Sequence, residues 1–148
     1  MLKRFKLLLT GLFLSLALAQ SMGCAITAPY DQQVYSQTTG LKVDALKLMD
    51  KATRTYDSQS EAISNFTDKW DKLYEYELHR AKNDIRISMW NLLRDPDKNL
   101  MGGFLKRWKT ESTLSETFIN EAKIQVGKAF DQLAELESGK ITPKELKQ

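Results

Sequence analysis

The chain has 148 residues, a formal net charge of +3, one cysteine and one histidine. Three of its 22 basic side chains, Lys3, Arg4 and Lys6, carry the whole excess, since the other 19 balance the 19 acidic side chains. This distribution argues against a basic face for nucleic acid, and a lone cysteine argues against a disulfide framework, which needs pairs.

The first 23 residues have the layout of an export signal. Basic residues open the segment, and the apolar run over 7–19 is shorter than the roughly 20 residues that span a bilayer. Small residues then precede Cys24. This order resembles the signal of bacterial lipoproteins. The resemblance implies that residues 1–23 are removed and that Cys24 is acylated, for example with palmitate. Because Ala25 follows the cysteine, it also implies attachment to the periplasmic face of the outer membrane.

A second cleavage site lies within the same segment. Ala17-Leu18-Ala19 fits ordinary signal peptidase, and cleavage there would release a soluble protein that begins at Gln20. The residues leave cleavage after Ala19, cleavage before Cys24 and an uncleaved anchor all open.

Residues 24–39 are small and polar, include Pro29 and lack a helical period. We expect a lipidated N-terminus followed by a flexible tether. From residue 40 to residue 138, apolar residues recur every three or four positions, which indicates a helical bundle.

The first apolar stripe covers 41–56 and is interrupted at 57–61. Ser58 and Glu61 have the spacing of a capping box, so we expect a second helix to begin there. One continuous helix over 41–93 stays open, because serine and aspartate also suit a polar helix face.

Two later stripes of equal length, over 60–93 and 104–137, flank a turn at 95–103. If they pack antiparallel, residues whose numbers sum to about 197 face each other, which pairs Phe66 with Phe130 and Leu73 with Ile124. We predict an all-α fold: an antiparallel helical hairpin that the helix over 41–56 completes to a three-helix bundle.

The bundle is expected to stop at Ser138-Gly139. Thr142, Pro143 and Glu145 then predict a short helical tail over 139–148. Residues 133–146 resemble a short C-terminal helix–turn–helix module of many bacterial proteins, a resemblance that implies self-association.

No motif for catalysis, a metal or a cofactor stands out. Glu75 and His79 lie one helical turn apart, but a zinc site needs three protein ligands. Gly102-Gly103 is too short for a phosphate loop. We expect a solvated polar face around His79, with ion pairs from Arg80 to its neighbours on the helix.

Two surfaces are candidates for binding. A basic cluster, Lys98, Lys106, Arg107 and Lys109, suits anionic lipid, a neighbouring copy of the chain, or simply solvent. Tyr74 and Tyr76 lie beside the main apolar stripe and predict an exposed interaction face, although they also suit a wider core.

These features together predict a non-enzymatic envelope lipoprotein. It is held to the membrane through Cys24 and acts as a structural or interaction module. Its expected partner is another envelope protein or a second copy, and not nucleic acid. The alternative is a bundle that binds a small apolar or lipid ligand, which would require an internal pocket.

Overall fold

The computed structural model describes residues 27–147, so Cys24 and the predicted export signal lie outside the described residues. This part contains three short 3₁₀ turns (Asp50–Thr53, Asp57–Gln59 and Glu145–Lys147) and five α-helices: α2 (Gln32–Met49), α3 (Ser60–Leu78), α4 (Asp84–Arg94), α5 (Met101–Glu111) and α6 (Glu116–Glu137). The predicted all-α class is confirmed.

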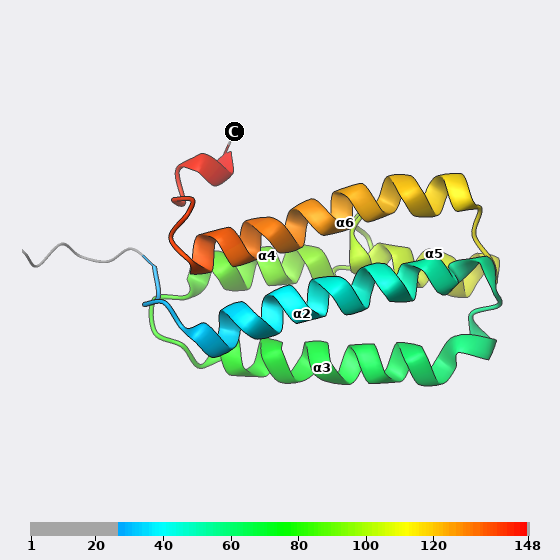
Figure 1. Cartoon of the computed structure of the whole chain (residues 1–148), viewed down its shortest axis with the longest axis horizontal. Coiled ribbons are helices and arrows are strands. Elements are labelled where there is room, and N and C mark those ends of the chain that lie inside the picture. Colours follow the sequence, from blue (N-terminus) through cyan, green and yellow to red (C-terminus); the bar gives the residue numbers. More distant parts are fainter. Residues whose placement is uncertain (1–26, 148) are drawn as a thin grey trace, which may run out of the picture.

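The chain runs back and forth along the long axis of an elongated bundle: α2 one way, α3 back, α4 and α5 together in the direction of α2, and α6 back again (Figure 1). Helix α2 packs against α3 and α6, and α4 packs against α3, α5 and α6. Helices α4 and α5 follow one another along the same side of the bundle. The predicted helical bundle is confirmed, although five helices build it where the sequence indicated three.

Helix α2 begins at Gln32, inside the segment that we expected to be a tether. The Asp31 carboxylate caps the helix by accepting hydrogen bonds from the backbone N–H groups of Gln33, at 2.8 Å, and Val34, at 3.2 Å. Buried residues recur along α2 at helical spacing: Val34, Thr38, Leu41, Ala45 and Leu48. The tether prediction is therefore wrong from residue 32 onward, because a buried threonine hid the first turns of the stripe.

The break before α3 is confirmed, but the predicted capping box does not form. Helix α3 begins at Ser60 after a 3₁₀ turn, and its N-cap, Gln59, makes no side-chain capping bond. The Ser58 hydroxyl instead donates to the Thr55 carbonyl oxygen at 2.7 Å. A tight turn takes the place of the side-chain cap.

Each long helix of the predicted hairpin is divided in two. Lys82 and Ser112 have φ of 61° and 68°, and these left-handed residues lie in the breaks after α3 and after α5. The breaks change which residues face inward, so Ile124 is 68 % exposed while Leu73, its predicted partner, is buried. A single register over 60–93 and 104–137 therefore does not hold throughout, although Phe66 and Phe130 are both buried.

The predicted turn at 95–103 ends earlier than expected, because α5 begins at Met101. A Cβ on Gly102 would lie 2.1 Å from the carbonyl oxygen of Arg94, and one on Gly103 would lie 1.8 Å from that of Lys98. Only glycine permits the backbone of α5 to pass this close to the end of α4.

Aromatic side chains fill the interior between the helices. Trp90 packs edge-on against Phe130, with ring centroids 5.9 Å apart, and Trp108 packs in the same way against Tyr56 at 5.4 Å. The indole N–H of Trp108 also donates to the Arg54 carbonyl oxygen at 2.9 Å, which fixes the turn between α2 and α3.

Helix α6 ends at Glu137, and Gly139 follows with φ of 71°, as the predicted stop requires. In the tail, Glu145 accepts hydrogen bonds from the backbone N–H and the hydroxyl of Thr142, at 2.6 and 2.8 Å. The helical tail is thus a single 3₁₀ turn, held by the predicted pair of residues.

Candidate functional site

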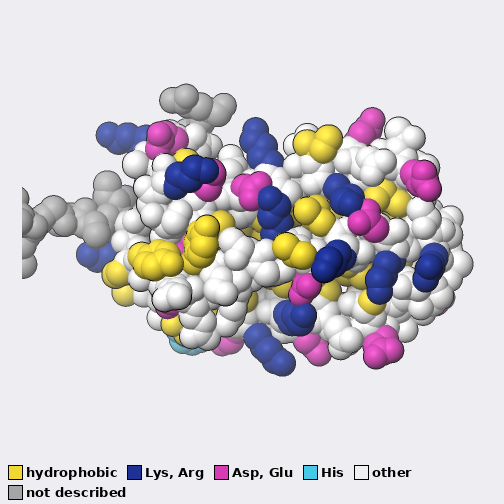
Figure 2. Space-filling model, viewed as in Figure 1, with side chains coloured by type: hydrophobic (Ala, Val, Ile, Leu, Met, Phe, Trp, Pro, Cys, Tyr) yellow, Lys and Arg dark blue, Asp and Glu magenta, His cyan; other side chains and the backbone are white. Residues whose placement is uncertain are grey.

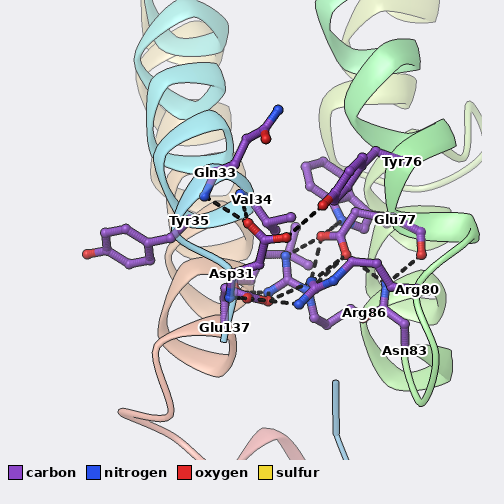
Figure 3. A network of polar contacts seen from close by, with 12 residues as sticks. Asp31, Gln33, Val34, Tyr35, Tyr76, Glu77, Arg80, Asn83, Arg86 and Glu137 are labelled. Carbon is purple, nitrogen blue, oxygen red and sulfur yellow. Dashed lines mark hydrogen bonds and ion pairs between the residues drawn. The ribbon is translucent and has the colours of Figure 1, made fainter. Parts of the chain in front are cut away.

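A network of buried charged side chains lies at the end of the bundle where α2 begins (Figure 3). It joins the last turn of α3, the start of α4 and the last turn of α6. Its charged members are two acids and two bases: Glu77, Glu137, Arg80 and Arg86.

Glu77 lies at the centre of this network, and none of its surface is exposed. Arg86 donates to its carboxylate through Nε at 3.1 Å and also through Nη2, and Trp90 donates from its indole N–H at 3.1 Å. Arg80 donates to the other carboxylate oxygen at 3.0 Å, and the side-chain amide of Asn83 donates at 2.7 Å. The buried carboxylate is therefore fully hydrogen-bonded, as burial of a charge requires.

Glu137 connects the same network to the start of the described chain. Its carboxylate accepts from Arg80 at 2.9 and 3.1 Å, and from the backbone N–H of Asp31 at 2.5 Å. Arg80 also donates to the Pro29 carbonyl oxygen at 2.5 Å, and the Tyr76 hydroxyl donates to Asp31 at 2.8 Å. We call these contacts of Pro29 and Asp31 the N-terminal clamp.

The acids and bases of the network stabilise each other in their charged forms. Burial alone raises the pKa of Glu77, but the hydrogen bonds and charge of Arg86, with the bonds from Asn83 and Trp90, outweigh burial and hold that pKa below its ordinary value of 4.5. Burial alone lowers the pKa of Arg80, and its hydrogen bonds to Glu137 and Glu77 more than offset this, so the pKa rises.

The clamp also perturbs two exposed groups. The hydrogen bond from the Tyr76 hydroxyl, followed by that from the Val34 N–H, lowers the pKa of Asp31. The same bond to Asp31 raises the pKa of Tyr76. Both shifts favour the state in which the clamp is closed, with a charged Asp31 and a neutral tyrosine.

This network was not predicted, although the sequence holds a signal for it. Glu77 follows Trp70 and Leu73 at the spacing of the buried face of α3. Arg86 precedes Trp90 and Leu93 in the same way on α4, and Glu137 continues the buried face of α6. Charged residues of opposite sign at core positions of neighbouring helices indicate a buried ion cluster.

The network has little capacity for acid–base chemistry, because each charged group already faces an opposite charge. No group of three or more potential ligands for a metal ion occurs among the described residues. Glu75 and His79 are exposed, with 3.7 Å between Oε1 and Nδ1. The expectation of a solvated face is wrong for Arg80, whose side chain is only 11 % exposed and pairs with the fully buried Glu77.

Tyr74 and Tyr76, the predicted interaction face, have different surroundings. The Tyr74 hydroxyl donates to Asn91 at 2.5 Å, and the Arg94 guanidinium lies 4.5 Å from the centre of its ring, so Tyr74 joins α3 to α4. Tyr76 is 45 % exposed, with its hydroxyl held by Asp31. Neither observation identifies a partner, so the interaction face stays a prediction.

A surface groove of about 530 Å³ lies between α5 and α6. Phe104 and Phe118, which stack with 6.0 Å between ring centroids, contribute to its lining, and Arg107 lies over the Phe118 ring. Ile124 also lines the groove and, at 68 %, is the most exposed large apolar side chain among residues 27–147. This hollow is open to solvent and is therefore not the internal pocket that the ligand-binding alternative requires.

Two of the four residues of the basic cluster beside this groove form ion pairs within the chain. Lys106 pairs with Asp97 at 2.6 Å, and Arg107 pairs with Glu111 at 2.8 Å. Figure 2 likewise shows basic and acidic side chains interspersed over the visible face. These pairs weaken the case for the cluster as a site for anionic lipid.

None of the helices in residues 27–147 is both long enough and apolar enough to cross a bilayer. Comparison of the chain with protein-family models, curated proteins and solved structures gives no match. The function is therefore inferred from the residues and geometry of this chain alone.

Proposed function

We propose that this chain is a lipid-anchored protein of the bacterial cell envelope, attached through Cys24, and that its bundle is a non-enzymatic structural or interaction module. The anchor is proposed from the resemblance of residues 1–24 to lipoprotein signals. The outer membrane is the proposed location, because Ala25 follows the cysteine.

The interaction role is proposed because the buried charged side chains are fully engaged with one another and with the backbone. Glu77, Glu137, Arg80 and Arg86 bind one another and the backbone, and so they stabilise the bundle instead of facing a substrate. Enzymes in contrast keep perturbed groups in a cleft where a substrate reaches them. The arrangement supports a rigid scaffold that presents its outer surface.

The groove between α5 and α6 is the proposed surface for a protein partner. The exposed Ile124 and the partly exposed Phe118, whose ring stacks on the buried Phe104, offer apolar area that a partner would bury. The groove's volume of about 530 Å³ lies in the range of small-molecule sites, so the second candidate is an apolar ligand bound in this open groove and not in an internal pocket.

Two experiments test this proposal. Cells fed a clickable palmitate analogue should label the wild-type chain and not Cys24→Ala, and the mature N-terminus should be residue 24. Equal labelling of both chains, or an N-terminus at Gln20, contradicts the anchor.

The interaction role is tested with a photo-crosslinking amino acid at Ile124 in intact envelopes. The matched control carries the same group at Ser64, an exposed residue of α3 away from the groove. An adduct specific to position 124, identified by mass spectrometry as an envelope protein or a second copy, supports the role. Specific labelling of a small apolar molecule at that position, with no protein adduct, favours the second candidate.

A further inference from the structure

The N-terminal clamp shortens the linker between the proposed anchor at Cys24 and the bundle. The tether expected from the sequence would have left residues 25–39 free, whereas Pro29 and Asp31 are bound to Arg80, Glu137 and Tyr76. Five residue steps separate Pro29 from Cys24, so the chain reaches about 18 Å at most between them. An anchored bundle must then keep its clamped end next to the lipid.

Two exposed tyrosines lie at this end of the bundle. Tyr30 is 58 % exposed and Tyr35 is 37 % exposed, and their ring centroids are 6.3 Å apart. Figure 2 shows apolar side chains exposed at the end where α2 begins, and in Figure 3 the Tyr35 ring points away from the charge network. The two rings therefore form an exposed aromatic pair close to the point at which the chain leads to Cys24.

Tyrosine is well suited to the boundary between lipid and water. Its ring is apolar while its hydroxyl stays hydrated, and tyrosine is enriched at the headgroup level of membranes. Contacts between the headgroup region and side chains next to the anchor orient the bundle on the bilayer and add to the binding that the acyl chains supply.

We infer that the clamped end of the bundle lies on the bilayer surface, with Tyr30 and Tyr35 in contact with the lipid headgroup region. This inference rests on the proposed lipid anchor. It places the opposite end of the bundle, with the turn between α2 and α3, away from the membrane.

The test uses the full-length chain, processed in cells and reconstituted in vesicles of phosphatidylethanolamine and phosphatidylglycerol, with a quencher on the lipid headgroup. A cysteine introduced at Ser36, beside the tyrosine pair, carries a fluorophore. The matched control is the same label at Ser64, also an exposed helical serine, in the second turn of α3 near the far end. Acylation of Cys24 is measured on the same samples with the clickable palmitate analogue.

We expect strong quenching at Ser36 and little at Ser64. Replacing both rings, Tyr30→Ser with Tyr35→Ser, should clearly reduce quenching at Ser36 and leave acylation unchanged, while the short link to Cys24 keeps that quenching above the level at Ser64. Val43→Ser, which removes another exposed apolar side chain of α2, should leave the quenching as in the wild type.

The outcomes distinguish this inference from the proposed lipid anchor at Cys24, on which it rests. A chain that is acylated and bound to vesicles, but shows no quenching at Ser36 or no effect of the double replacement, overturns the inference and leaves the anchor standing. The tyrosine pair would then be free for a protein partner. A chain without acylation at Cys24 overturns both.

Discussion

Removing the charge of Glu77 should destabilise the bundle strongly, although Glu77→Gln hardly changes the size of the side chain. The carboxylate is fully buried and accepts hydrogen bonds from Arg86, Arg80, Asn83 and Trp90. A glutamine replaces one acceptor oxygen with an NH₂ group that faces these donors. It also leaves Arg86, itself buried, with less compensation for its charge.

The expected loss follows from the cost of an uncompensated buried charge. Breaking a buried ion pair by removing one partner costs about 3–5 kcal/mol, against a total stability of about 5–15 kcal/mol for a domain. In a bundle of this size, such a loss should lower Tm by about 10–25 °C. The measurement is urea and thermal unfolding, followed by circular dichroism, of the chain from residue 25 onward.

Glu75→Gln is the matched control, because it is the same chemical change two residues away on α3. Glu75 is exposed, and its contact is a distant one with His79 at the surface, so its loss should stay within about 0.5 kcal/mol. A Glu77→Gln protein that unfolds at the same urea concentration as Glu75→Gln would refute the argument that the network is buried and stabilising.

Three further predictions test other parts of the structure. Because the folded-state pKa of Glu77 is depressed, its contribution to stability is present above about pH 4.5 and is lost as pH falls through the lower folded-state value. Tm should therefore fall less steeply below pH 4.5 in Glu77→Gln than in the wild type. Parallel plots of Tm against pH for the two proteins would contradict the pKa shift. Trp70→Ala removes a ring that is 4 % exposed and should cost about 3–5 kcal/mol of unfolding free energy. Tyr76→Ala should cost less than about 1 kcal/mol, because its ring is half exposed and its one hydrogen bond lies at the surface. Equal losses in urea titrations would place Tyr76 in the core. Gly102→Ala should lower the free energy of unfolding by about 1–3 kcal/mol or more, because the new Cβ clashes with the end of α4. Gly40→Ala, in the open middle of α2, should raise it by about 0.5–1 kcal/mol. A Gly102→Ala protein as stable as the wild type would show that α4 and α5 do not pass as closely as described.

Three of the interruptions between helices were predictable. The break between α2 and α3, the turn after α4 and the stop after α6 all follow from short-range chemistry. Glycine, proline and small polar residues at these points disfavour a continuing helix whatever surrounds them. The same reasoning failed at Lys82 and Ser112, where neither glycine nor proline marks the break.

The buried face of α2 shows why the start of the bundle was misplaced. The apolar stripe of α2, followed toward the N-terminus, stops at Leu41 because the next inward-facing residue is Thr38. Thr38 is nevertheless buried, and Val34 continues the same face one turn earlier. The charge network was missed for the same reason. Glu77, Arg86 and Glu137 occupy core positions, and a hydrophobic pattern discards such residues as surface.

The all-α class, the export-like pattern before Cys24 and the helix ends beside the predicted turns can be read from the sequence alone, because each depends on residues that are neighbours along the chain. Only the tertiary structure decided that two predicted helices are each divided and that Arg80 holds Pro29. These features depend on contacts between residues far apart in sequence, such as Asp31 with Glu137. A buried charge is stable only where an opposite charge meets it in space, and spacing along one helix does not show which other helix supplies that partner.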